Sequence, residues 1–147
     1  RFGDPETQAI LPRLKSDLLE VMLAVSNEKL SKVVKTGGLH WDSRACVSVV
    51  CASGGYPGNY EKGKLISGLE DARSMPDVVV FHAGTKKEDG KYFTSGGRVL
   101  GVTGLGNNIS QAIRTAYQAV DKIHFDGMHY RKDIGQKALN IAPALKS

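Results

Sequence analysis

An uninterrupted apolar run at Ala45–Ala52 is the feature that most constrains the fold. Its length is that of a strand, and its continuity indicates a strand buried on both faces. Asp89-Gly90 adds a hairpin signal between two later apolar segments, Val78–Phe81 and Lys91–Thr94. The other predicted strands are Lys64–Leu69, Arg98–Thr103 and a short final one near Met128–Lys132.

One clear helix interrupts this β pattern. Asn108 and Gln111 form a capping-box pattern, and apolar residues then recur at one-face helical spacing as far as Ile123. Such a helix should lie on a sheet. Several strands, one packed amphipathic helix and a short last strand together predict an α+β domain with a mainly antiparallel sheet. Pro143–Ser147 is expected to be a frayed tail.

The N-terminal part has a helical pattern instead. A short helix over Thr7–Leu11 should end or kink at Pro12, and Ser16-Asp17 should cap a second one. That second helix is too apolar for a surface helix and is expected to pack on two sides. We therefore predict a helical unit with its linker over residues 1–36 and the α+β domain over residues 37–147.

The first residues form a candidate binding turn. Asp4 suits an N-cap, Pro5 suits the first helical position, and Gly3 allows close approach of a ligand or of another backbone. Free N–H groups of that turn, with Arg1 beside them, could cradle a carboxylate or a phosphate. An ordinary capped helix with a frayed terminal arginine explains the same residues.

Composition narrows the class of protein. The 147 residues suit one domain, or a small domain with a piece of another, and the contents of 41% hydrophobic and 24% charged residues are those of a soluble globular protein. The net charge of +5 comes from scattered residues, which favours a solvated surface over nucleic-acid binding. No apolar run has the length of a membrane span.

Cys46 and Cys51 lie in the same predicted strand, so their Cα atoms should be roughly 16 Å apart, too far for a disulfide. Two buried free thiols indicate a reducing compartment, and we expect a cytoplasmic protein.

Two glycine-containing patterns carry little chemistry. Gly58–Lys64 approaches a phosphate-binding P-loop but is followed by Leu65 instead of Ser or Thr, so we reject it. Gly101, Gly104 and Gly106 are better explained by a strand-to-helix turn than by a dinucleotide loop.

The histidines show no metal-binding spacing, and His82 is interpreted as a satisfied core or interface residue. Tyr130–Asp133 could bind an anion, or Asp133 could simply pair with a neighbouring cation.

Several blocks, taken in order, resemble one enzyme family, phosphoribosylamine–glycine ligase (glycinamide ribonucleotide synthetase). The resemblance extends from Arg1 to about Leu139, nearly the whole chain. The blocks are Arg1–Gln8 continued by Leu14–Leu18, Ala52–Gly58 with Tyr60–Gly63, Val80–Thr85, Gly96–Leu100 and Tyr130–Gly135.

The resemblance implies the C-terminal end of an ATP-grasp domain followed by the C-terminal domain of the ligase. It implies a reaction in which ATP phosphorylates glycine, and 5-phosphoribosylamine attacks the glycyl phosphate to give glycinamide ribonucleotide, ADP and phosphate in purine biosynthesis. It also implies ATP and Mg²⁺ (or Mn²⁺) as cofactors, and the remaining domains of the polypeptide as partners, with no nucleic acid and no membrane. By the same resemblance Arg1, Gly3, Asp4 and Pro5 line the substrate site.

The family's metal-binding Glu and Asn precede the residue that matches Arg1, and this sequence starts at that arginine without a methionine. We therefore expect a fragment that has no metal ligands, no catalytic residue and no ligase activity of its own. The alternatives are the C-terminal domain of another ATP-grasp ligase or carboxylase, and a non-catalytic basic binding module.

Overall fold

A computed structural model describes residues 3–35 and 37–141 and confirms the α+β class. The helical N-terminal part consists of α1 (Thr7–Ile10), a 3₁₀ turn η1 (Leu11–Arg13), α2 (Leu18–Ser26) and α3 (Leu30–Lys35). The strands are β1 (Ala45–Ala52), β2 (Leu65–Ile66), β3 (Val78–His82), β4 (Thr85–Glu88), β5 (Lys91–Thr94) and β6 (Arg98–Gly106). The remaining helices are α4 (Leu69–Arg73), α5 (Ile109–Val120) and α6 (Gln136–Ile141).

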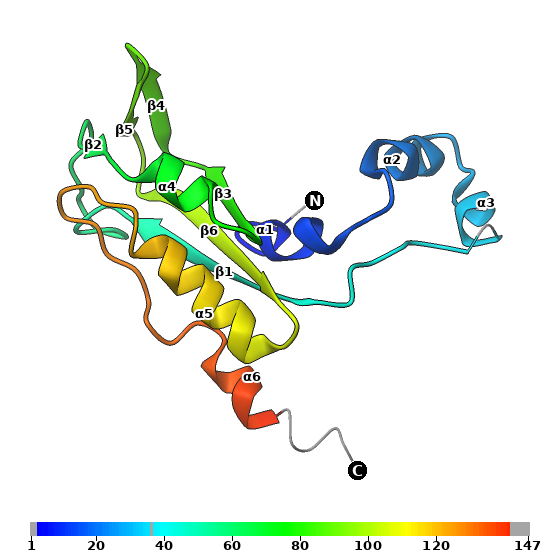
Figure 1. Ribbon diagram of the computed structural model, residues 1–147. Helices are drawn as coiled ribbons and strands as arrows, with labels where there is room; N and C mark the ends of the chain where they lie inside the picture. The colour runs from blue at the N-terminus through cyan, green and yellow to red at the C-terminus, as the bar shows by residue number, and fades with distance from the viewer. Residues whose placement is uncertain (1–2, 36, 142–147) are drawn as a thin grey trace.

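The central sheet has the order β1-β6-β3 and is antiparallel throughout. Val102 of the middle strand lies opposite Val49 on one side and Val80 on the other, and all three side chains are buried. Helix α5 covers one face of this sheet (Figure 1). The short helix α1 contacts β1 and β6 on the opposite face, so the sheet carries the N-terminal turn on one side and its core helix on the other.

The glycines Gly101, Gly104 and Gly106 all lie inside β6, so their interpretation as a strand-to-helix turn was wrong. The turn is Asn107-Asn108, which follows the strand. A Cβ at Gly104 would lie 2.4 Å from the backbone nitrogen of Ala116 in α5. Gly104 and Gly106 therefore let the backbone of α5 approach the sheet, which is a role that local sequence does not reveal.

A second antiparallel sheet, β2-β5-β4, lies at the end of the first (Figure 1). Asp89-Gly90 does make a hairpin, but its first strand is β4 and not the predicted Val78–Phe81. Strand β4, with the sequence Thr-Lys-Lys-Glu, is mostly exposed and lacks the apolar pattern on which the prediction relied.

Three other predictions needed correction. Lys64–Leu69 is a strand only at Leu65–Ile66, and helix α4 starts at Leu69. The strand predicted near Met128–Lys132 is a single β-bridge between His129 and Ala52. These two residues exchange two backbone hydrogen bonds, of 2.9 and 3.0 Å. Helices α3 and α6 were missed. The tail expected at Pro143–Ser147 lies outside the described residues.

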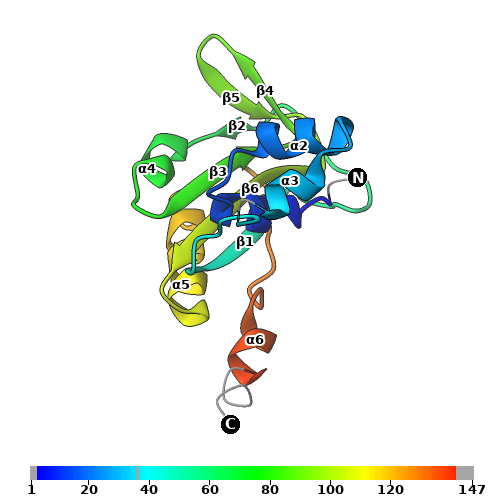
Figure 2. The same cartoon turned by 90° about the vertical axis from the view of Figure 1, so that its right-hand side faces the viewer.

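Helices α2 and α3 stand apart from the sheets in Figure 1 and lie in front of the central sheet in the view of Figure 2. Asp17 caps α2 as predicted, with its carboxylate accepting from the amides of Leu19 and Glu20. The predicted two-sided packing of α2 is wrong for the described residues, since none of its residues is buried and Leu19 is 64% exposed. None of the described helices is long and apolar enough to cross a membrane.

Two antiparallel stretches join this helical pair to the rest of the molecule. The Lys15 amide donates to the His40 carbonyl (2.9 Å), and the Asp42 amide donates to the Arg13 carbonyl (2.6 Å). Leu14 and Trp41 form the bridge between these two bonds. We call residues 13–15 and 40–42 the neck, because the chain leaves for α2 and returns from α3 through it.

Removing the cap of α5 should destabilise the protein. Asn108 Oδ1 accepts from the Gln111 amide (2.9 Å), while Gln111 Oε1 accepts from the amide of Asn107 (3.0 Å). Asn108→Ala loses the first bond and is expected to lower the free energy of unfolding by about 1 kcal/mol. Urea denaturation measures the loss. Ser110→Ala, an exposed change in the same turn, should stay within about 0.5 kcal/mol of wild type, and equal losses would contradict the capping role.

Candidate functional site

The N-terminal turn, residues 3–8, is fixed to the open face of the central sheet by buried hydroxyl groups. The hydroxyl of Thr103 in β6 donates to the carbonyl of Gln8 (3.0 Å) and exchanges a second hydrogen bond with the hydroxyl of Ser48 in β1 (2.9 Å). Thr103 is fully buried. The sheet therefore holds the C-terminal end of the turn through the hydroxyl group of a fully buried residue.

Asp4 is held by Arg98, the first residue of β6. Arg98 Nη2 lies 2.7 Å from Asp4 Oδ2, and Nη1 donates to the Asp4 carbonyl at 3.4 Å. The side-chain amide of Gln8 donates to Asp4 Oδ1 at 3.3 Å. Both oxygens of the carboxylate therefore have a partner, and the guanidinium also contacts the backbone of the same residue.

The prediction that Asp4 is an N-cap with Pro5 at the first helical position was wrong. Helix α1 starts at Thr7, and Glu6 precedes it without a side-chain cap. The four-residue helix leaves Asp4 in the preceding turn, where a cation from the sheet, Arg98, lies within reach of its carboxylate.

The structure brings three of the four predicted site residues together. Gly3 and Pro5 are half-buried and flank the exposed Asp4, while Arg1 lies outside the described residues. The amides of Gln8 and Ala9, which follow the expected anion cradle, donate to the carbonyls of Pro5 and Glu6. The exposed residues among 3–8 are Asp4 and Glu6, so the turn presents carboxylates to solvent.

Sequence reasoning missed Arg98 and Gln8 as parts of this site. Arg98 lies 94 positions from Asp4 and makes its contact across the sheet, so no local spacing connects them. The available signal was the Gly96–Leu100 block, which carries part of the family resemblance and includes Arg98.

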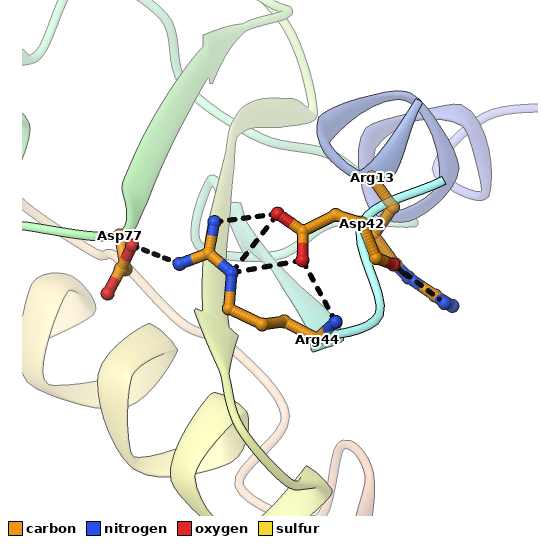
Figure 3. Close-up of polar contacts among 4 residues, drawn as sticks. All are labelled: Arg13, Asp42, Arg44 and Asp77. Carbon is orange, nitrogen blue, oxygen red and sulfur yellow. Dashed lines mark hydrogen bonds and ion pairs between the residues drawn. The ribbon is translucent and has the colours of Figure 1, made fainter. Parts of the chain in front are cut away.

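A second polar cluster lies beside the neck (Figure 3). Arg44 donates to both carboxylate oxygens of Asp42, with Nη2 2.9 Å from Oδ2, and its Nη1 pairs with Asp77. Arg13 donates to the Asp42 carbonyl through Nε and Nη2, both at 3.1 Å. The cluster joins the helical part, the neck and the starts of β1 and β3.

Hydrogen bonds from Arg44 hold the pKa of Asp42 at about 2, below its usual value. The hydrogen bond to Asp42, followed by that to Asp77, raises the pKa of Arg44 in turn. Asp42 is 8% exposed, whereas the Arg44 side chain is 34% exposed, so only the carboxylate of this ion pair is shielded from water. These contacts have a structural role, and we call Arg13, Asp42 and Arg44 the clamp.

The clamp predicts a specific acid sensitivity. Because the pKa of Asp42 falls from 3.8 to about 2 on folding, its stabilising contribution is complete above pH 4 and is lost as the pH falls toward 2. Asp42→Asn should lower the melting temperature at pH 7 by about 5 °C and flatten the acid-induced loss of stability.

Thermal melts from pH 7 to pH 2 measure both effects. Asp133→Asn is the matched control, because Asp133 also pairs with an arginine, Arg131 (2.6 Å), but both side chains are more than half exposed. Equal melting temperatures for the two variants would contradict the clamp.

His82 is satisfied, as predicted. Its Nδ1 hydrogen-bonds to the Thr85 hydroxyl and its Nε2 accepts from Arg73, both at 2.9 Å, and its ring stacks on Tyr92 at 4.5 Å. Burial, followed by the charge of Arg73, lowers the pKa of His82. All its polar atoms are used within the fold, so it has a structural role.

The other candidates are structural too. Lys64, at the end of the rejected P-loop, pairs with Glu61 and Asp126 and leads into a strand. Both cysteines are free, and burial raises the pKa of Cys51 to about 12, which makes its thiol unreactive. Within residues 3–35 and 37–141, no three His, Cys, Asp or Glu side chains gather to hold a metal ion.

Comparison with known proteins assigns the chain to a family. The family of the phosphoribosylglycinamide synthetase C domain matches residues 46–137, which is more than half of the sequence. The chain belongs to this family.

Relatives that are longer than this chain also match its N-terminal part. The chain is 55% identical over 139 residues to a phosphoribosylamine–glycine ligase of Synechocystis and 54% identical over 142 residues to one of Rhodopirellula baltica. These alignments cover 95% and 97% of the chain but 32% of each relative. The chain thus spans about a third of the length of these relatives.

A solved structure agrees. The crystal structure of a phosphoribosylamine–glycine ligase from Thermotoga maritima matches 90% of the chain and 31% of its own, with a TM-score of 0.67 and 35% identity. The antiparallel α+β fold is therefore that of a ligase C domain. The predicted boundary after residue 36 stays a prediction, since the family match begins at residue 46.

Proposed function

We propose that this chain is the C-terminal part of a phosphoribosylamine–glycine ligase. The whole enzyme would join glycine to 5-phosphoribosylamine with ATP, through a glycyl phosphate, in purine biosynthesis. The observation that carries the proposal is the match to relatives of this name over at least 95% of the chain. This extent goes well beyond residues 46–137, which the C-domain family model matches.

In this enzyme the turn would bind substrate. Gly3, Asp4 and Pro5, with Arg1, would contact glycine or phosphoribosylamine. The fixed position of the turn supports the assignment, because Thr103 and Arg98 hold it at both ends. Catalysis of this kind depends on positioning and on charge neutralisation more than on a covalent nucleophile.

The described residues offer no metal-binding cluster, so they do not fit Mg²⁺ or Mn²⁺. We assign the metal ion and the ATP phosphates to other parts of the enzyme. What this chain contributes is the carboxylate of Asp4 on a rigid sheet and a surface for its neighbours.

That surface is helix α2, which exposes apolar side chains on more than one side. Leu19, Leu23 and Val25 are all more than half exposed, although such side chains normally avoid water. We assign them to the interface with the remaining domains of the polypeptide. Both cysteines are free thiols, which supports a cytoplasmic location.

A chimera tests the proposal. The matching third of the Synechocystis ligase is replaced by this chain, and glycinamide ribonucleotide is measured with ADP release. We expect ATP-dependent activity within about tenfold of the Synechocystis enzyme, because the fold and the turn are retained. A folded but inactive chimera would refute the proposal.

The 147 residues alone should form no product, since they carry no site for the metal ion among the described residues. Product formation by the purified chain would refute this second expectation. The unmodified Synechocystis enzyme serves as the positive control.

A further inference from the structure

We propose that Arg98 is a positioning residue for the substrate amino group, and that it acts through Asp4. The inference rests on the proposed function, because it assigns a task to one residue of the proposed substrate turn. Both substrates of the proposed reaction carry an amino group. A carboxylate is the side chain suited to accept hydrogen bonds from such a group.

The contact geometry fixes Asp4 in two ways. Arg98 Nη2 binds the carboxylate oxygen Oδ2 at 2.7 Å, which sets the direction of the side chain. Arg98 Nη1 donates to the Asp4 carbonyl at 3.4 Å, which restrains the backbone of the turn. A lysine has a single charged nitrogen and cannot reproduce both contacts with the fixed fork of a guanidinium.

Arg98 itself is anchored by the sheets. It begins β6, the middle strand, and lies opposite Ala52 of β1. Its carbonyl accepts from the amide of Gly84 at 2.8 Å. The backbone of Arg98 therefore cannot move without a rearrangement of the central sheet, and its side chain reaches Asp4 from this fixed base.

The carboxylate keeps capacity for a ligand. An ionised carboxylate has about four acceptor positions. Arg98 occupies one on Oδ2, and Gln8 occupies one on Oδ1 through a long contact of 3.3 Å. The Asp4 side chain is 53% exposed, so the remaining positions are open to a substrate amine.

Folding stability does not explain the pair. Arg98 and Asp4 are 40% and 53% exposed, and exposed ion pairs typically contribute little to stability. Arg131–Asp133 is a second arginine–aspartate pair with nearly the same separation, 2.6 Å, on a different surface. This second pair provides a matched control for the loss of an exposed arginine–aspartate ion pair.

The test uses the chimera that carries the whole chain. Arg98→Met should raise the KM for glycine or for phosphoribosylamine at least about tenfold, with kcat within about threefold, because substrate binding loses its oriented acceptor. Arg98→Lys should recover part of the loss. Arg131→Met should change neither constant, and all three variants should melt within about 2 °C of wild type.

A double-mutant cycle separates positioning from independent effects. If Arg98 acts through Asp4, Arg98→Met adds little to the KM of Asp4→Asn. Additive effects would overturn the inference. So would an unchanged KM in Arg98→Met, or a KM change that follows a lowered melting temperature.

The failure of the proposed function gives a different result. A wild-type chimera without activity overturns the proposed function, and the inference with it. An active wild-type chimera in which Arg98→Met behaves like Arg131→Met overturns the inference alone.

Discussion

Gly104→Ala is expected to destabilise the protein by roughly 3 kcal/mol or more, because the added methyl group has no space. The new Cβ would lie 2.4 Å from the nitrogen of Ala116 and 2.9 Å from the carbonyl oxygen of Ala112. Both atoms belong to the backbone of α5, so no side-chain rotation relieves the clash. The helix must move away from the sheet, which opens the core.

Gly101→Ala, in the same strand, is the matched control. Its Cβ would meet the nearest atom, Cγ of Gln8, at 3.5 Å, an ordinary contact distance. We expect a change within about 1 kcal/mol. Urea denaturation of both variants measures the difference, and equal stabilities would show that α5 does not depend on close contact with β6.

Gly68→Ala is expected to be the second large loss, roughly 4 kcal/mol, since strain and a steric clash add together. Gly68 has a φ of +74°, in the left-handed region, and precedes α4. Its Cβ would also overlap the carbonyl oxygen of Lys122 at 1.7 Å. The variant should melt well below wild type and expose the buried contacts between α4 and the core.

Gly63→Ala separates the two causes. Gly63 has nearly the same φ, +79°, but no atom lies within 4 Å of the added Cβ. Its loss should be about 1 kcal/mol, the strain alone. If thermal melts gave both variants the same melting temperature, the overlap with Lys122 would be relieved at no cost.

The sequence predicted elements whose pattern is local. Strands β1 and β3 are apolar runs, and α5 combines a cap with one-face spacing, so burial and hydrogen bonding act within a short stretch. Strand β4 was missed because an exposed ribbon needs no apolar side chains. The final strand was overpredicted, because Met128 and Tyr130 pack against the core while only His129 between them pairs with Ala52.

The candidate site was likewise predictable from the sequence only where its residues are neighbours in the chain. Gly3, Asp4 and Pro5 could be named because they are consecutive and resemble a family motif. The partner of Asp4 could not, because the contact with Arg98 exists only once α1 lies on the sheet. Local cap rules even gave Asp4 the wrong role, since they do not include a distant cation.

The neck makes α2 and α3 a side branch of the molecule. The chain enters and leaves this branch at adjacent points, Lys15 and His40, so the path from α1 to β1 is already closed without it. The Arg13–Asp42–Arg44 clamp holds the base of this branch at the edge of the sheet (Figure 3). The attachment of the branch is therefore separate from the Asp4–Arg98 pair, which shares no residue with the neck or the clamp.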